Sequence, residues 1–151
     1  MQIASVYKLV NKGYLIFGTA RTISGFRIGV EPYIRIAETE INIDNITNAI
    51  KTSLKCSATE KIPDPKNWKE DDKIFLKKAG LKSLKELNKH STKTINIKKE
   101  GDNIIFIPTR HAEKPDEGFL HKGEDEKVII PSTASNQEIL AAFVLAFDRC
   151  E

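Results

Sequence analysis

The stretch TINIKKEGDNIIFIP, residues 94–108, carries the clearest fold signal in the chain. Apolar and polar residues alternate in TINIK before Glu100-Gly101-Asp102, and the apolar stretch IIFIP follows it. This pattern predicts two strands, Thr94–Lys98 and Asn103–Pro108. Gly and Asp are turn residues, so the two strands are expected to form an antiparallel hairpin. A short apolar run at Lys127–Pro131 predicts one further strand.

The N-terminal residues 3–37 show a similar organisation. Apolar and β-branched runs alternate there with the turn signals Lys12-Gly13, Ser24-Gly25 and Glu31-Pro32. The runs are Ile3–Val10, Tyr14–Ala20, Phe26–Val30 and Tyr33–Ala37. Such spacing predicts a meander of short antiparallel strands.

The hydrophobic period then changes from two to between three and four. Ile43, Ile46, Ile50 and Leu54 follow this spacing, which predicts an amphipathic helix at about 43–56, capped by Asn42. The prolines of KIPDPKNW cannot continue it, and Trp68 is expected to anchor that connection against the core. Two more short helices are predicted, the first ended by Gly80 and the second capped by Ser83.

The last predicted helix opens at a capping box formed by Ser135 and Glu138 and ends near Arg149. Its segment Ile139–Phe147 is apolar on every side. Either the helix is enclosed by the sheet and other helices, or one of its faces meets a partner.

These elements predict an α+β fold in a single domain, residues 1–151. We expect an antiparallel sheet with an N-terminal meander, a central group of three short helices, a later hairpin and a C-terminal helix. The chain has no export signal and no apolar run of membrane length, which predicts a cytoplasmic protein without a membrane partner. Cys56 and Cys150 are expected to be free thiols.

Charge is spread unevenly, although the net charge is only +3. The segment Lys61–Lys99 holds twelve Lys and five acidic residues, whereas Glu113–Glu126 holds six acidic residues and two Lys. One alternative hypothesis is therefore an RNA-binding module at Lys66–Lys89, with an affinity that falls steeply with salt. That segment has no Arg and few aromatic residues, which favours a solvated helical surface instead.

Catalytic chemistry finds little support in the sequence. His111 lies close to Glu113, and a hydrolase centred on this pair is a third hypothesis. Neighbouring positions on a loop do not place a carboxylate against an imidazole, so a surface or structural histidine is favoured. His90, His121 and the cysteines lack metal-ligand spacing, and the glycines form no phosphate-binding loop. We therefore expect no catalytic residue, no cofactor and no metal site.

The segment Arg110–Leu120, which follows the hairpin and is expected to form a charged, apolar-tipped loop, suggests binding instead. Acidic residues surround Phe119 and Leu120, which is the arrangement of an apolar anchor within a charged rim. These two side chains could equally pin the loop to the core. A carboxylate-rich loop would complement a basic partner such as a nuclease. The candidate partner-binding residues are Arg110, His111, Glu113, Asp116, Glu117, Phe119, Glu124 and Asp125.

Several stretches, in order, resemble one known family. They are TISGFRIGVEPYIRI, IPDPKNW, FLKKAGLKSLKEL, IIFIPTR followed by GF, and IPSTASNQEI leading into an Ala-rich helix that ends DRCE. From Gly18 to the C-terminus the chain resembles the CdiI family, the immunity proteins of contact-dependent growth inhibition (CDI) systems.

The resemblance implies a small cytoplasmic protein that binds the C-terminal toxin domain of its cognate CdiA and blocks it by occlusion. Many such toxins are nucleases, and the family has no catalytic residues to carry over. The last helix departs from the expected pattern, because Leu140, Val144 and Leu145 stand where a Gly and polar residues are expected. Its outer face is therefore a candidate for a homodimer or a toxin contact. Direct binding of nucleic acid is not expected.

Overall fold

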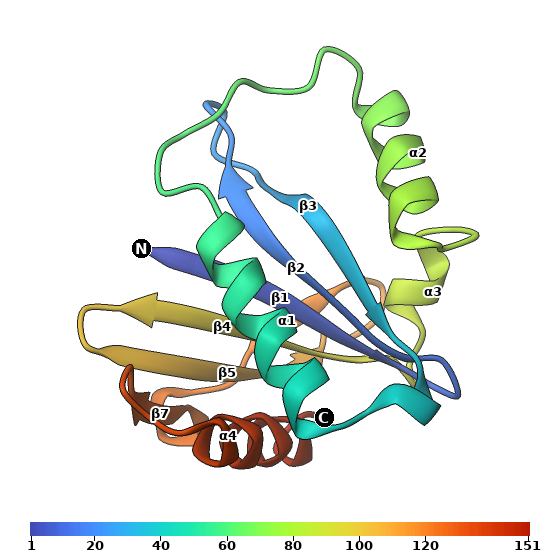
Figure 1. Cartoon of the computed structure of the whole chain (residues 1–151). Helices are drawn as coiled ribbons and strands as arrows, with labels where there is room; N and C mark the ends of the chain where they lie inside the picture. The colour runs from blue at the N-terminus through green and yellow to red at the C-terminus, as the bar shows by residue number, and fades with distance from the viewer.

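The computed structural model describes every residue, Met1–Glu151 (Figure 1). Its centre is a seven-stranded antiparallel sheet in the order β3-β2-β1-β4-β5-β6, with β7 also paired to β5. The strands are β1 (Gln2–Leu9), β2 (Gly13–Arg21), β3 (Arg27–Ile36), β4 (Lys93–Glu100), β5 (Asn103–His111), β6 (Phe119–His121) and β7 (Val128–Pro131). The helices are α1 (Ile43–Cys56), α2 (Trp68–Ala79), α3 (Lys85–Asn88) and α4 (Asn136–Asp148), with 3-10 turns η1 (Glu38–Glu40) and η2 (Glu124–Glu126).

The predicted meander and hairpin are both present, with one difference. Phe26–Val30 and Tyr33–Ala37 were expected as separate strands, but they form the single strand β3 that runs through Pro32. The register of β2 against β3 shifts at this point, between Ile16 and Gly18. Because β3 is an edge strand, Pro32 needs no hydrogen-bond donor on its outer side, and the strand can continue.

All four predicted helices are present, but the N-cap of α3 differs from the prediction. α1 covers the predicted residues, and the Asn42 side chain accepts a hydrogen bond from the Asn45 backbone. α2 ends at Gly80, which is left-handed with φ 72°, and α4 opens with the predicted capping box. The predicted Ser83 cap was wrong, because the N-cap of α3 is Leu84 and no side chain caps it.

The two faces of the sheet carry different helices. α1 and α4 cover one face, where the larger core gathers residues such as Ile16, Ile95, Phe106 and Phe143 (Figure 1). α2 and α3 lie on the other face, where a smaller core gathers Leu15, Phe17, Ala79, Leu81 and Leu87. None of the helices has the length and apolar character needed to cross a membrane.

α4 combines the two arrangements expected for it. Ile139, Phe143 and Phe147 are buried against the sheet and α1. Val144 and Leu145 are exposed on the opposite side of the helix. One apolar side of α4 therefore packs in the core, and the other apolar side is exposed to solvent.

Candidate partner-binding surface

The segment expected as a loop from Arg110 to Leu120 is largely a second hairpin. β5 continues to His111, and β6 begins at Phe119 and pairs with it. Arg110, His111, Phe119 and Leu120 were therefore wrongly placed in a loop. The true loop spans residues 112–118, and we call this segment the acidic arm.

The C-terminal residue supports this second hairpin. The backbone N–H of Glu151 donates to the carbonyl oxygen of Thr109 at 3.0 Å, and the N–H of His111 donates to the carbonyl oxygen of Glu151 at 3.2 Å. These bonds form beyond Pro108, the last β5 residue in register with β4. Glu151 thus forms hydrogen bonds with the backbone of β5 beyond the point where β4 pairs with it.

His111 has a structural environment. Its Nε2 atom lies 2.8 Å from the carbonyl oxygen of Thr92, so this nitrogen donates the hydrogen bond. The imidazole ring also packs against His90 and Phe119, at centroid distances of 5.1 and 4.6 Å. No carboxylate forms an ion pair with the ring, and Glu113 is exposed. The geometry lacks the carboxylate contact that the hydrolase hypothesis requires.

Phe119 and Leu120 were expected either to anchor a partner or to pin the loop to the core. The two residues have different surroundings, so each fits one of these hypotheses. The half-buried Phe119 ring lies between Tyr7 and His111, with centroid distances of 6.1 and 4.6 Å. Leu120, in contrast, is 46% exposed. Phe119 therefore fixes the hairpin to the sheet, while Leu120 is free to contact a partner.

The predicted acidic residues fall into two groups. Glu113, Asp116 and Glu117 lie on the acidic arm, are exposed and form no ion pair. Glu124 and Asp125 belong to η2, in the connection between β6 and β7. Because the arm extends past the end of β5 while η2 lies beside the strand, the structure does not merge the two groups into one cluster.

The η2 group is partly neutralised. Nζ of Lys127 lies 2.6 Å from a carboxylate oxygen of Glu124, and this hydrogen bond lowers the pKa of Glu124. Asp125 is exposed and has no such partner. The free negative charge of the site therefore lies mainly on the acidic arm.

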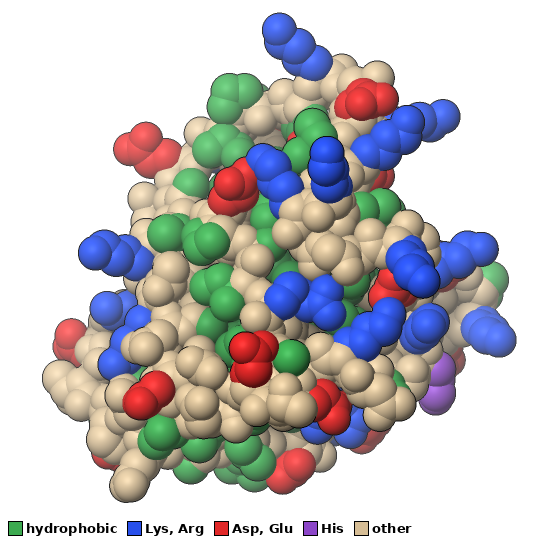
Figure 2. Space-filling model, turned by 45° about the vertical axis from the view of Figure 1, so that its right-hand side comes forward, with side chains coloured by type: hydrophobic (Ala, Val, Ile, Leu, Met, Phe, Trp, Pro, Cys, Tyr) green, Lys and Arg blue, Asp and Glu red, His purple; other side chains and the backbone are tan.

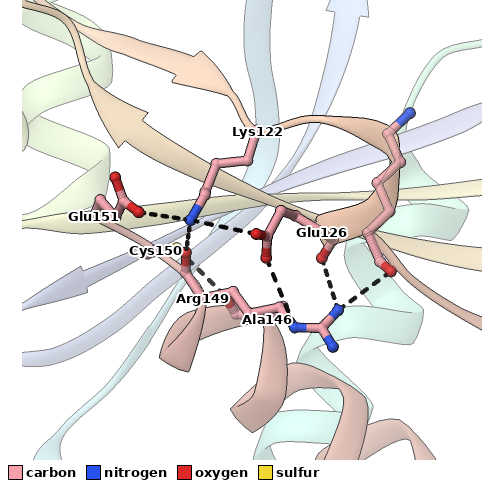
Figure 3. A network of polar contacts seen from close by, with 7 residues as sticks. Lys122, Glu126, Ala146, Arg149, Cys150 and Glu151 are labelled. Atoms are coloured by element: carbon pink, nitrogen blue, oxygen red, sulfur yellow. Dashed lines mark hydrogen bonds and ion pairs between the residues drawn. The ribbon is translucent and has the colours of Figure 1, made fainter.

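A polar network that the sequence patterns did not reveal holds η2 to the end of α4 (Figure 3). Nζ of Lys122 donates to the carbonyl oxygen of Arg149 and to the Glu151 carboxylate, both at 2.9 Å. Arg149 in turn donates to the carbonyl oxygen of Glu126, also at 2.9 Å. The hydrogen bond to Glu151 raises the pKa of Lys122. The only sequence signal was the basic residue at the end of the last helix.

The lysine-rich segment forms a solvated surface, as the sequence favoured. Figure 2 shows blue side chains gathered toward the side of the molecule that carries α2 and α3. Lys77, Lys82, Lys85 and Lys89 are exposed there. Acidic side chains lie among the basic ones, because Glu70 and Asp72 of α2 are also exposed on this side.

The sequence matches a known protein family, and the fold matches solved structures. Residues 5–150 match the family of CDI immunity proteins, CdiI. The chain belongs to the CdiI family. No curated protein matches the sequence at a significant level.

Two solved structures share the CdiI fold seen here. One is a protein of unknown function from Neisseria meningitidis, with a TM-score of 0.73 and 16% identity over 99% of this chain and 95% of that chain. The other belongs to a CdiA-CT/CdiI toxin and immunity complex from Yersinia pseudotuberculosis, with a TM-score of 0.72 and 20% identity over 99% of this chain and 97% of that chain. At these identities the likeness concerns the fold alone.

Proposed function

We propose that this CDI immunity protein neutralises the C-terminal toxin domain of a cognate CdiA in the cytoplasm, by binding it stoichiometrically and covering its active surface. The family match over residues 5–150 carries this proposal. A tight pair of this kind buries about 1,600 Å² in total.

We propose the acidic arm as one part of the toxin-binding surface. Three carboxylates without ion-pair partners, those of Glu113, Asp116 and Glu117, project from a hairpin that Phe119 and His111 fix to the sheet. A charged surface held in place in this way attracts a basic partner and accelerates its capture. Leu120, which is exposed beside the arm, supplies a candidate apolar anchor.

The sign of this charge supports a nuclease as the target. A nuclease neutralises phosphates with Lys and Arg, so its substrate-binding surface is basic. An acidic arm could occupy that surface in place of nucleic acid. Asp125 adds a further exposed carboxylate on η2, whereas Arg110 lies on β5, in the hairpin that carries the acidic arm.

Rescue of cells tests the function itself. The toxin domain would be taken from the long exoprotein gene expected next to this one and expressed with or without this protein. We expect growth only in its presence, together with a 1:1 complex on size-exclusion chromatography. Continued toxicity despite full expression of the folded protein would contradict the proposal.

Charge reversal tests the proposed surface. Glu113, Asp116 and Glu117 are changed together to Lys, and toxin affinity is expected to fall about tenfold or more, mainly through slower association. A second variant, Glu124→Lys with Asp125→Lys, tests the η2 group separately. The matched control changes Glu60, Glu100 and Asp102 to Lys. It makes the same charge change at exposed sites, two of them at the β4–β5 end of the sheet. If the arm variant and the control bind the toxin with equal affinity, the arm is not part of the interface.

We also propose that the exposed side of α4 mediates self-association. Val144 and Leu145 are apolar and exposed on adjacent positions of this helix. A Val144→Lys, Leu145→Lys variant is expected to shift a dimer to monomer in sedimentation velocity. A monomeric wild type at high concentration would exclude this part of the proposal.

A further inference from the structure

A group of large apolar side chains is exposed at the corner where the β2–β3 turn meets the start of α2. Ile23 is 65% exposed, Phe26 61% and Trp68 41%. The rings of Phe26 and Trp68 meet edge to face at a centroid distance of 5.4 Å. Trp68 was expected against the core, and the structure instead places it on the surface with an aromatic partner. Contiguous exposed apolar groups on a soluble protein commonly mark interaction sites.

Two arginines face each other at the base of the same β2–β3 turn. Arg21 and Arg27 are direct partners across the β2–β3 ladder. Like charges in directly opposite positions destabilise a sheet, so this pair is a cost to the fold. Neither guanidinium forms an ion pair: Nη1 of Arg21 donates to the carbonyl oxygen of Gly25 at 3.2 Å, and Nη1 of Arg27 donates to Oγ1 of Thr19 at 2.9 Å. Most of their donor capacity is therefore available to a partner.

The electrostatics of Arg27 agree with an unneutralised pair. Partial burial, followed by the repulsion from Arg21, lowers the pKa of Arg27. The carboxylate of Asp64, which belongs to the neighbouring connection, is already bound by Ser24 through its backbone N–H at 3.2 Å and through its hydroxyl group. It does not neutralise either arginine.

Three chain segments hold the corner rigid. The N–H of Thr22 donates to the carbonyl oxygen of Phe26 at 2.7 Å, and the N–H of Phe26 donates to Oγ1 of Thr22 at 3.1 Å. Ile62, from the connection before α2, forms backbone bonds with Ile23 at 2.9 Å and with Arg21 at 3.0 Å. A surface ordered before binding loses little conformational entropy when a partner arrives.

We propose that this corner, formed by Arg21, Ile23, Phe26, Arg27 and Trp68, is a second contact surface for the toxin domain. An acidic loop of the toxin places a carboxylate between the two guanidiniums and an apolar side chain against Phe26 and Trp68. This inference rests on the proposed immunity function. Arg, Trp and aromatic side chains are the residues that dominate binding energy at interfaces, and guanidinium groups bind carboxylates through paired hydrogen bonds.

The surrounding charges favour a protein over a nucleic acid as the occupant. Arg27 lines a pocket of about 350 Å³ together with Asp71 and Asp72. A phosphate backbone running across the corner would meet these carboxylates and be repelled by them. A single carboxylate from a protein loop needs only the arginine pair.

The Arg21→Glu variant gives the sharpest test, because the stability of the fold is expected to hold or rise while the affinity for the toxin falls. The change creates an opposite-charge pair with Arg27, so the melting temperature holds or rises by up to about 3 °C. Affinity for the cognate toxin domain, measured by calorimetric titration, falls about 30-fold or more. The double variant Phe26→Ala, Trp68→Ala is expected to lose affinity to a similar extent while retaining the far-UV spectrum of the fold.

The matched control is Lys55→Glu, which makes the same charge change at an exposed position of α1. Its affinity is expected to stay within about threefold of wild type, as for a charge outside the interface.

If the wild type binds tightly and both corner variants bind with the same affinity, this inference alone would be overturned. A wild type that does not bind the toxin would overturn the proposed function and this inference together. A wild type that retains short single-stranded RNA, and loses it on Arg21→Glu with toxin affinity unchanged, would assign the corner to nucleic acid and overturn the inference.

Discussion

Nε2 of His111 lies 2.8 Å from the carbonyl oxygen of Thr92, which joins the end of β5 to the residue just before β4. The bond closes the base of the acidic arm, because His111 is the last residue of β5 and Phe119, at the other end of the arm, packs on its ring. His111, which the hydrolase hypothesis treated as an acid–base group, therefore holds the acidic arm in place.

Loss of this bond should destabilise the protein. In His111→Ala the carbonyl oxygen of the buried Thr92 loses its donor, and we expect a loss of about 1–3 kcal/mol in the free energy of unfolding. Urea denaturation at neutral pH measures it. The control is His90→Ala, which removes an exposed ring stacked on His111 and should cost about 0.5 kcal/mol or less. Equal losses in the two variants would contradict the structural role of His111.

Alanine substitutions at Phe119 and Leu120 should have different effects, the first on stability and the second on toxin binding. Phe119→Ala removes a ring packed between Tyr7 and His111, so unfolding should become easier by about 1–3 kcal/mol. Leu120→Ala should change stability by about 0.5 kcal/mol or less, because this residue is on the surface and 46% exposed. Leu120→Ala is instead expected to weaken toxin binding. A Leu120 variant that loses stability but keeps full affinity would reverse this assignment.

The two cysteines should react at very different rates. Cys56 is exposed, whereas Cys150 is buried and its pKa is raised by burial, which keeps less of the thiol as reactive thiolate. With a thiol-specific reagent at mildly alkaline pH we expect one rapid equivalent in the native protein and a second only in denaturant. A Cys56→Ser variant should show no rapid equivalent. Rapid labelling of that variant would show that the end of α4 opens easily.

Acid should weaken the network at the end of α4. The hydrogen bond from Lys122 lowers the pKa of Glu151 in the folded protein relative to the unfolded chain. The folded state therefore binds this proton less readily, and its stabilising effect is present above the ordinary carboxylate pKa of about 4.3 and lost as pH falls through the lowered value. Glu151→Gln should lower the melting temperature at pH 7 but have little effect near pH 3. A constant difference across that range would contradict this role.

Local signals were read correctly from the sequence because each depends on residues close together in the chain. The alternation of residues 94–98, the helix period of α1 and the capping box of Ser135 with Glu138 each lie within one element or one turn. The same holds for Gly80, whose left-handed backbone ends α2. The acidic and apolar composition of the candidate surface was also visible in sequence.

Other features were decided only by the tertiary structure, because they depend on pairings between distant segments. The pairing of His111 with Phe119 turned an expected loop into a hairpin and divided Phe119 from Leu120. The edge position of β3 allowed Pro32 to remain within a strand. The register that sets Arg21 opposite Arg27, and the approach of Trp68 to Phe26, follow from strand and helix contacts that no local pattern specifies. Sequence periodicity determines which residues share a face of one element, whereas packing between elements determines which faces meet and which remain open to a partner.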